Sequence, residues 1–145
     1  HGLDYLEDND PIPVDGIVNM PTTAPLRSVI DVENCLDEYE KGDVDIVITV
    51  TDAHRSPYFN MVKNNQDGYT SLVIPGNKIV RRQDASSVYD MTTVAYVAKP
   101  KYVKNSNGLF DGKVRSVYVP VDRAVDIDTE LDFIVAKAII SMKKI

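Results

Sequence analysis

The stretch Asp45-Ile46-Val47-Ile48-Thr49-Val50 decides the fold predicted for this chain of 145 residues. Its side chains are mostly apolar and β-branched, which is typical of a strand that is covered on both faces of a sheet. Such strands occur where helices flank a largely parallel sheet. The stretch therefore predicts an α/β fold.

The residues upstream complete a strand–helix–strand pattern. Residues 16–20 have the composition of a short buried strand, and Ser28 with Asp31 resembles a capping box at the start of a helix. Apolar side chains then recur at helical spacing: Val32, Cys35, Leu36 and Tyr39. Gly42 supplies the stop of that helix. This order predicts a βαβ unit with a parallel pair of strands.

The middle of the chain changes character. Residues 69–74 have strand composition and run directly into a turn signal, Pro75-Gly76-Asn77. We expect residues 72–74 to face Ile79 and Val80 across that turn as a hairpin, an antiparallel excursion from the parallel core.

Further elements are expected towards the C-terminus. Residues 93–97 and 114–119 read as strands, and an apolar helical face follows Thr129, which forms a second possible capping box with Asp132. We therefore expect one α/β domain over 1–145, with a mostly parallel sheet, flanking helices and the hairpin.

Composition limits the kinds of partner. Hydrophobic residues make up 43% and charged residues 26% of the chain, which is ordinary for a globular protein. The net charge of −6 disfavours a nucleic-acid polymer or an anionic membrane as partner. A single cysteine, Cys35, and the lack of an apolar run near the roughly 20 residues that span a bilayer predict a cytoplasmic location.

Asp126 and Asp128 are the most informative polar residues. They lie two positions apart, so in an extended segment both side chains project to the same side while Ile127 turns inward. Two convergent carboxylates suit a hard cation such as Mg²⁺, which usually shares its oxygen ligands with phosphates. Aspartates are also favoured near helix N-termini as caps, and both interpretations remain open.

Three further groups of residues are candidates for ligand contacts. Arg81-Arg82-Gln83 could capture a carboxylate or phosphate, or form a solvated hairpin end. Arg27 follows the first strand of the βαβ unit, at the carboxyl end where ligands bind, although ordinary turn chemistry also explains it. Tyr58 and Phe59 follow the second strand, where they could line a sugar pocket, form an interface or fill the core.

Taken together, three motifs resemble the CMP-sialic acid synthetase (acylneuraminate cytidylyltransferase) family. They are Thr23-Ala24-Pro25-Leu26-Arg27-Ser28, then Arg81-Arg82-Gln83-Asp84 with Tyr89 and Tyr96, then Asp126-Ile127-Asp128-Thr129-Glu130-Leu131-Asp132. They occur in the family's order, and the resemblance extends over nearly the whole chain from Gly16 onward. It implies a nucleotidyltransferase-like, Rossmann-like fold.

The resemblance also implies an activity. Members of the family transfer CMP from CTP to the anomeric hydroxyl of a nonulosonic acid and release pyrophosphate. Mg²⁺ would be held by Asp126 and Asp128, while Arg82 and Gln83 match the sugar-binding pair and Tyr96 matches a tyrosine near the acyl-sugar pocket.

Family members form homodimers that exchange a segment, which corresponds to a region near 55–112 here. Tyr58, Phe59 and Phe110 fall in that region, so the resemblance implies that they serve a partner's site.

The sequence departs from the family at two places. Pro21 stands where the family usually has a glutamine, and the glycine- and lysine-rich N-terminal signature that grips CTP is absent. The chain also begins at His1 without an initiator methionine, so we expect a partial domain that is inactive alone. The alternative is a non-catalytic sugar-binding or dimerisation module that keeps the fold.

Overall fold

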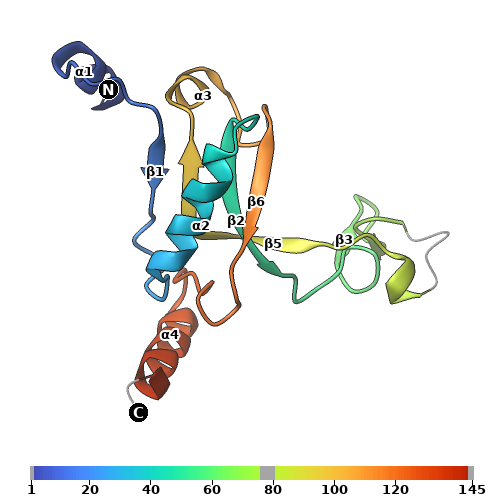
Figure 1. Cartoon of the computed structure of the whole chain (residues 1–145). Coiled ribbons are helices and arrows are strands. Elements are labelled where there is room, and N and C mark those ends of the chain that lie inside the picture. Colours follow the sequence, from blue (N-terminus) through green and yellow to red (C-terminus); the bar gives the residue numbers. More distant parts are fainter. Residues whose placement is uncertain (1, 76–80, 144–145) are drawn as a thin grey trace. The chain divides into compact units, whose positions relative to one another are not determined.

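The computed structural model describes residues 2–75 and 81–143, which divide into two compact units. The sheet unit comprises the described residues of His1–Thr51 and Met91–Ile145, and the hairpin unit those of Asp52–Asp90. In chain order (Figure 1) the elements are α1 (Gly2–Asn9), β1 (Ile17–Asn19), α2 (Val29–Glu40), β2 (Ile46–Asp52), β3 (Val62–Asn64), β4 (Thr70–Leu72), the 3₁₀ turn η1 (Arg82–Asp84), β5 (Tyr89–Ala98), α3 (Pro100–Asn105), β6 (Val114–Tyr118) and α4 (Glu130–Lys143).

The sheet unit is built on a mixed four-stranded sheet in the order β1-β5-β2-β6. β2 and β6 pair in parallel with Ile46 opposite Val114, whereas β1 and β5 pair antiparallel with Ile17 opposite Ala98. The α/β class is confirmed. The expected direct pairing of the first two strands is wrong, because the ten-residue β5 lies between β1 and β2.

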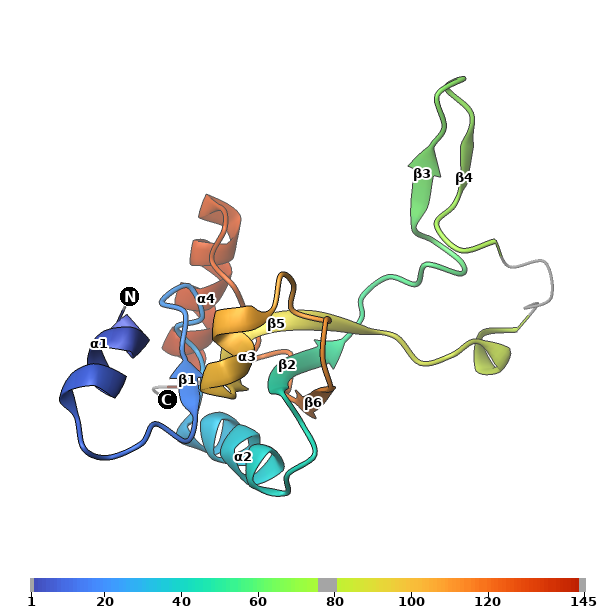
Figure 2. The same cartoon turned by 90° about the horizontal axis from the view of Figure 1, so that it is seen from above.

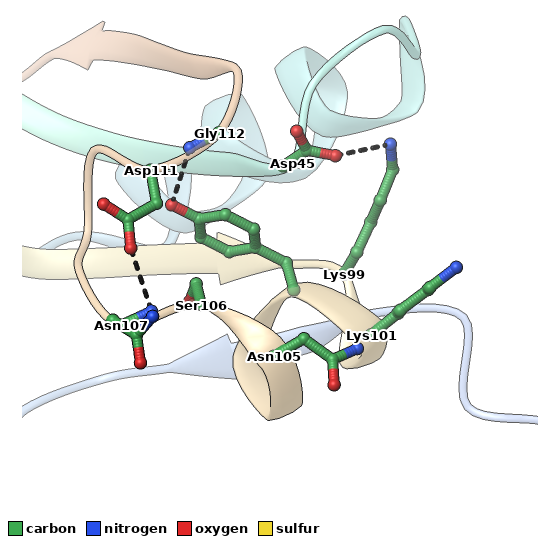
Figure 3. A pocket seen from close by; sticks show the side chains of 9 residues that line it. Asp45, Lys99, Lys101, Asn105, Ser106, Asn107, Asp111 and Gly112 are labelled. Atoms are coloured by element: carbon green, nitrogen blue, oxygen red, sulfur yellow. Dashed lines mark hydrogen bonds and ion pairs between the residues drawn. The ribbon is translucent and has the colours of Figure 1, made fainter.

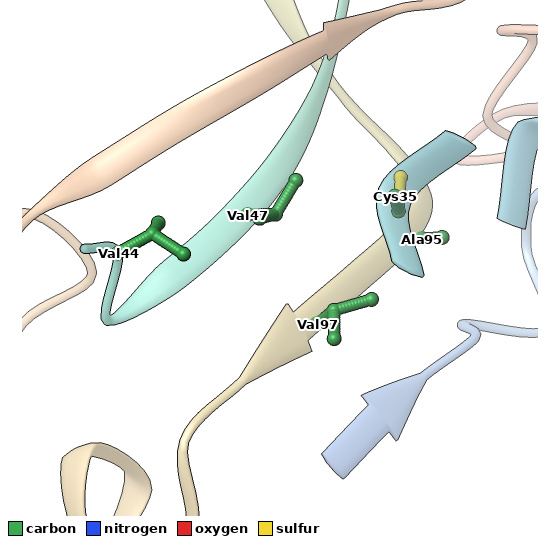
Figure 4. Packing of buried hydrophobic residues seen from close by; sticks show 5 residues of the cluster. All are labelled: Cys35, Val44, Val47, Ala95 and Val97. Carbon is green, nitrogen blue, oxygen red and sulfur yellow. The ribbon is translucent and has the colours of Figure 1, made fainter. Parts of the chain in front are cut away.

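One face of the sheet is covered by α2. Figure 4 shows the wholly buried cluster beneath this helix: Cys35, Val44, Val47, Ala95 and Val97. At the helix start the Asp31 carboxylate accepts a hydrogen bond from the Ser28 N–H (2.8 Å), and Gly42 follows the helix with a φ of 76°. The predicted helix, its capping residues and its stop are thus confirmed.

The opposite face carries a second apolar cluster. Its buried members are Ile46, Ile48, Val50 and Ala98. Tyr102 of α3 and Leu109 pack against them, and Figure 2 shows α3 beside β5 in the view from above. Since alternate strand residues point to opposite faces, β2 is buried on both sides, as its sequence predicts.

The hairpin unit contains the antiparallel pair β3–β4, with Val62 opposite Leu72 and Asn64 opposite Thr70. Gly68 has a φ of 81° in the connection, a conformation that glycine adopts without steric cost. The expected second arm, Ile79 and Val80, lies outside the described residues. β3 was not predicted, because three residues that include a lysine and an asparagine carry no strand pattern.

Two helices, α1 and α3, are not among the elements expected from the sequence. α1 is held by Lys104, whose ammonium lies 2.7 Å from an Asp4 oxygen and 2.5 Å from a Glu7 oxygen. α3 begins with Pro100, a residue that suits the first helical turn. Among residues 2–75 and 81–143, none of the helices combines the length and the apolar character that a bilayer crossing needs.

Thr49 joins β2 to β5 through its side chain. The hydroxyl is fully buried, accepts hydrogen bonds from the Thr92 hydroxyl (2.7 Å) and the Ala95 N–H (3.3 Å), and lies 3.2 Å from two carbonyl oxygens of β5. It thereby gives a partner to a buried backbone N–H. The Thr49 side chain therefore helps to hold β2 and β5, the two central strands, together.

Replacing that hydroxyl should destabilise the sheet unit. Thr49→Val keeps the side-chain shape but removes the oxygen that accepts the Thr92 hydroxyl and the Ala95 N–H, so we expect the free energy of unfolding to fall by about 1–3 kcal/mol. Urea denaturation measures this as a lower midpoint at unchanged slope. Thr51→Val is the matched control, because the Thr51 hydroxyl is buried without a hydrogen-bond partner in the described chain. An equal loss in both variants would contradict the assignment.

Candidate functional site

The loop 119–128, called here the aspartate loop, carries Asp126 and Asp128 away from β6. Val119 is wholly buried, and its N–H donates to the Val50 carbonyl (2.8 Å). A tight turn follows, in which the Arg123 N–H donates to the Pro120 carbonyl (2.9 Å). The loop therefore starts at the carboxyl ends of β2 and β6, the end of an α/β sheet at which ligands bind.

Thr129 and Asp132 cap the helix that follows the loop. The Asp132 carboxylate accepts hydrogen bonds from the Thr129 hydroxyl (2.7 Å) and N–H (2.8 Å), and the Asp132 N–H donates back to that hydroxyl (3.3 Å). These bonds hold the pKa of Asp132 below its ordinary value. The second capping box is confirmed, so α4 does not need Asp126 or Asp128 as its cap.

Asp126 presents a buried and unsatisfied carboxylate oxygen. Oδ1 has essentially no contact with solvent and no hydrogen-bond partner in the described chain. The pKa of Tyr96 is raised, first by burial and then by the negative charge of Asp126, so the structure brings these two predicted site residues together. A buried carboxylate oxygen without a donor is costly unless a cation or proton compensates it.

This arrangement fits a shared cation site rather than a metal cage. Within residues 2–75 and 81–143, no three acidic, histidine or cysteine side chains gather closely enough to hold an ion by themselves. Mg²⁺ is typically held by one or two carboxylates together with substrate phosphates and water. Asp126 with its unpaired oxygen and the exposed Asp128 match that donor set.

The aspartate loop is bonded to the loop that follows β1. The Ile127 N–H, between the two aspartates, donates to the Thr23 carbonyl (2.9 Å). Ala24, Val94 and Val119 form a small buried cluster beside it. Two of the three sequence motifs thus lie side by side in the sheet unit.

Arg27 closes its own loop. Its Nε donates to the Ala24 carbonyl (3.1 Å), and Nη2 donates to the Pro21 carbonyl. The guanidinium therefore fixes the loop between β1 and α2. A substrate contact by Arg27 stays a prediction.

Of the other predicted residues, Phe110 is exposed and belongs to the sheet unit, and the rest belong to the hairpin unit. Arg82 and Gln83 lie in η1, and Gln83 is exposed. Tyr58 and Phe59 are half-buried in a turn in which the Ser56 carbonyl accepts the Phe59 N–H (3.2 Å). Phe59 lines a pocket of about 230 Å³ with residues 53–56 and 85–88. Their roles as substrate contacts stay predictions.

The sequence did not reveal an ion pair between the aspartate loop and α2, in which Asp31 is buried and Arg123 is half-buried. The Asp31 carboxylate, 1% exposed, accepts a fork of bonds from Arg123, with Nη2–Oδ1 at 2.8 Å and Nε–Oδ2 at 2.9 Å. The carboxylate raises the pKa of Arg123 above its ordinary value. The sequence pattern identifies Asp31 only as a helix cap, and no local pattern links it to a residue 92 positions away.

A larger pocket of about 570 Å³ lies at the amino end of β2 (Figure 3). Two of its polar side chains are bonded within the chain: Asp45 accepts from Lys99 (3.1 Å) and from the Lys113 N–H (2.9 Å), and the Tyr102 hydroxyl accepts the Gly112 N–H (3.2 Å). The pKa of Asp45 is lowered mainly by the Lys113 N–H and then by Lys99. None of the predicted site residues lines this pocket. Its hydrogen bonds connect the start of β2 to the segments around Lys99 and Lys113 and have a structural role.

Comparison with known proteins identifies several relatives. The chain is 29% identical over 131 residues to post-translational flagellin modification protein B of Campylobacter coli, covering 90% of this chain and 55% of that protein. It is 32% identical over 107 residues to CMP-N,N'-diacetyllegionaminic acid synthase of Campylobacter jejuni, covering 68% and 41%. It is 24% identical over 117 residues to an N-acylneuraminate cytidylyltransferase of Streptococcus agalactiae, covering 81% and 28%. The chain thus spans about half, or less, of these relatives' length.

The fold has a solved counterpart. The 4-diphosphocytidyl-2C-methyl-D-erythritol synthase of Anaerococcus prevotii superposes on 97% of this chain and 64% of its own with a TM-score of 0.61. At 16% identity this likeness concerns the fold alone. No family model matches the chain.

The closeness of Asp126 to Tyr96 can be tested by titration. Asp126→Asn removes a negative charge that disfavours the phenolate, so the pKa of Tyr96 should fall, while burial still keeps it above the ordinary value. Tyrosine ring-carbon NMR measures this shift. Asp128→Asn is the matched control and should leave Tyr96 unchanged. Equal effects of the two substitutions, or none from the first, would contradict the geometry.

Proposed function

We propose that this chain belongs to the CMP-sialic acid synthetase (acylneuraminate cytidylyltransferase) family and that its protein is a cytidylyltransferase. The proposed substrates are CTP and a sialic-acid-like nonulosonic acid. The names of two relatives, a CMP-legionaminic acid synthase and an N-acylneuraminate cytidylyltransferase, support this class of sugar.

The proposed reaction is an in-line transfer. The anomeric hydroxyl oxygen of the sugar attacks the α-phosphorus of CTP, and a new phosphorus–oxygen bond forms. The bond from that phosphorus to the oxygen bridging the β-phosphate breaks, and pyrophosphate leaves with that oxygen. The hydroxyl proton passes to solvent. Positioning and charge stabilisation carry most of the catalysis in transfers of this kind.

The observation that carries the proposal is the buried Oδ1 of Asp126, beyond the carboxyl ends of β2 and β6, which has no hydrogen-bond partner among the described residues. Asp126 and Asp128 would hold Mg²⁺, which would supply positive charge to the phosphates of the nucleotide. The chain's contribution is to keep both carboxylates in a loop that is bonded to Thr23 and followed by a capped helix.

The sugar would be bound by other predicted residues. A guanidinium offers a planar fork to a carboxylate, so we assign Arg82 with Gln83 to the sugar carboxylate. Tyr96 is assigned to the acyl group, since it lines an apolar pocket of about 470 Å³. In a proposed homodimer the hairpin unit supplies Tyr58 and Phe59 to the partner's site.

Nucleotide binding tests the proposal first. We expect CTP to bind the whole protein only when Mg²⁺ is present, because two carboxylates without a cation repel the triphosphate. Calorimetric titration with CTP, with and without Mg²⁺, measures this. GTP is the matched control for the base. The absence of metal-dependent CTP binding would favour a sugar-binding or dimerisation module.

A single substitution tests the role of the paired carboxylates. Asp128→Asn in the whole protein should lower kcat by at least about a hundredfold, because it removes a charged oxygen ligand where phosphate charge develops. The thermal midpoint should be unchanged, since Asp128 is exposed. Asp122→Asn is the control, as Asp122 lies in the same loop but pairs with Lys143 (2.8 Å). Activity like that of the unsubstituted protein in Asp128→Asn would remove the assignment.

A further inference from the structure

The ion pair of the buried Asp31 with the half-buried Arg123, called here the clamp, joins the start of α2 to the aspartate loop. Asp31 belongs to the first turn of α2, and Arg123 lies three residues before Asp126 in the aspartate loop. Two bonds of 2.8 and 2.9 Å make the contact bidentate. A guanidinium bound in this way is fixed in direction as well as in distance.

Asp31 also holds the loop between β1 and α2. Its Oδ2 accepts the Ser28 N–H (2.8 Å) while it accepts Arg123. Ser28 ends the loop that carries Thr23 and Arg27, and Arg27 closes that loop on the carbonyl of Ala24. One buried carboxylate therefore ties the helix start, the loop after β1 and the aspartate loop into one block.

The clamp and the Ile127 bond hold the aspartate loop on both sides of Asp126. Arg123 is fixed to Asp31 before it, and the Ile127 N–H is fixed to the Thr23 carbonyl after it (2.9 Å). Thr23 lies in the loop between β1 and α2, which Asp31 holds through the Ser28 N–H. Loosening Asp31 should therefore release both attachments, and with them the direction of the Asp126 carboxylate.

General stability does not explain why the Asp31 carboxylate is buried, with a half-buried arginine as its partner. Removing a carboxylate from water costs several kcal/mol, and a buried ion pair often contributes little net stability compared with apolar side chains of similar volume. An ion pair with fixed geometry does specify one arrangement of the groups around it. The clamp fixes the aspartate loop three residues before Asp126, so it can set the positions of the two aspartates.

We propose that Asp31 and Arg123 are positioning residues of the transfer reaction, which hold Asp126 and Asp128 in the geometry that binds the cation and nucleotide phosphates. This inference rests on the proposed function, but the clamp itself can be tested without it. It assigns to Asp31 a role beyond capping α2.

Amide hydrogen exchange in the chain tests the clamp directly. Arg123→Lys keeps the positive charge but lacks the planar fork, and Asp31→Asn keeps an acceptor for the Ser28 N–H but loses the charge. In both variants we expect the Ile127 amide to exchange at least about tenfold faster, with the Val119 amide within about twofold of the unsubstituted chain. Val119 is a suitable reference because its N–H bonds to the sheet, at the Val50 carbonyl.

Arg115→Lys is the matched control. Arg115 pairs with Glu38 (3.0 Å) and so also joins β6 to α2, but away from the aspartate loop. It should leave the Ile127 amide unchanged. If Ile127 does not respond to either clamp variant, or if Ile127 and Val119 accelerate together, the clamp does not position the loop and the inference is overturned.

Metal affinity tests the link to the reaction. In the whole protein with CTP, the dissociation constant of Mn²⁺, measured by electron paramagnetic resonance, should rise about tenfold or more in Arg123→Lys and stay unchanged in Arg115→Lys. Unchanged Mn²⁺ affinity in Arg123→Lys, with binding in the unsubstituted protein, would overturn the positioning role alone. No Mn²⁺ binding in the unsubstituted protein would contradict the proposed function, and the positioning role with it.

Discussion

The burial of β2 on both faces is the constraint on which the rest of the sheet unit depends. α2 covers one face through the cluster around Val47, and Tyr102 and Leu109 cover the other around Ile48. A strand enclosed in this way cannot shift in register without moving apolar side chains to the wrong face. Its carboxyl end is therefore fixed, and so is the loop from β6, whose Val119 bonds to Val50.

The parts of the fold that were predicted are those with a local signal. α2 and α4 follow from helical spacing with a capping box, and β2 follows from its continuous β-branched run. The place of β5 between β1 and β2 carries no such signal, because strand order depends on contacts between distant segments. β3 was missed for another reason, since three residues are too few to set a period.

The candidate site also contains residues with a local sequence signal and residues without one. Asp126 and Asp128 were found because paired carboxylates before a helix form a local pattern. The structure adds what the pattern could not decide: Thr129 and Asp132 supply the cap, and Asp126 keeps a buried oxygen that has no partner within 2–75 and 81–143. The pairing of Asp31 with Arg123 could not be predicted, because the two residues are 92 positions apart and no sequence pattern connects them.

The central claim is that Asp126 and Asp128 hold a divalent cation, and anomalous diffraction tests it most directly. Crystals of the whole protein grown with CTP and Mn²⁺ would be measured on both sides of the manganese absorption edge. The account predicts an anomalous peak between the carboxylates of Asp126 and Asp128, within about 2.2 Å of an oxygen from each. Bound CTP with no manganese peak there, or with the peak at other residues, would contradict the account.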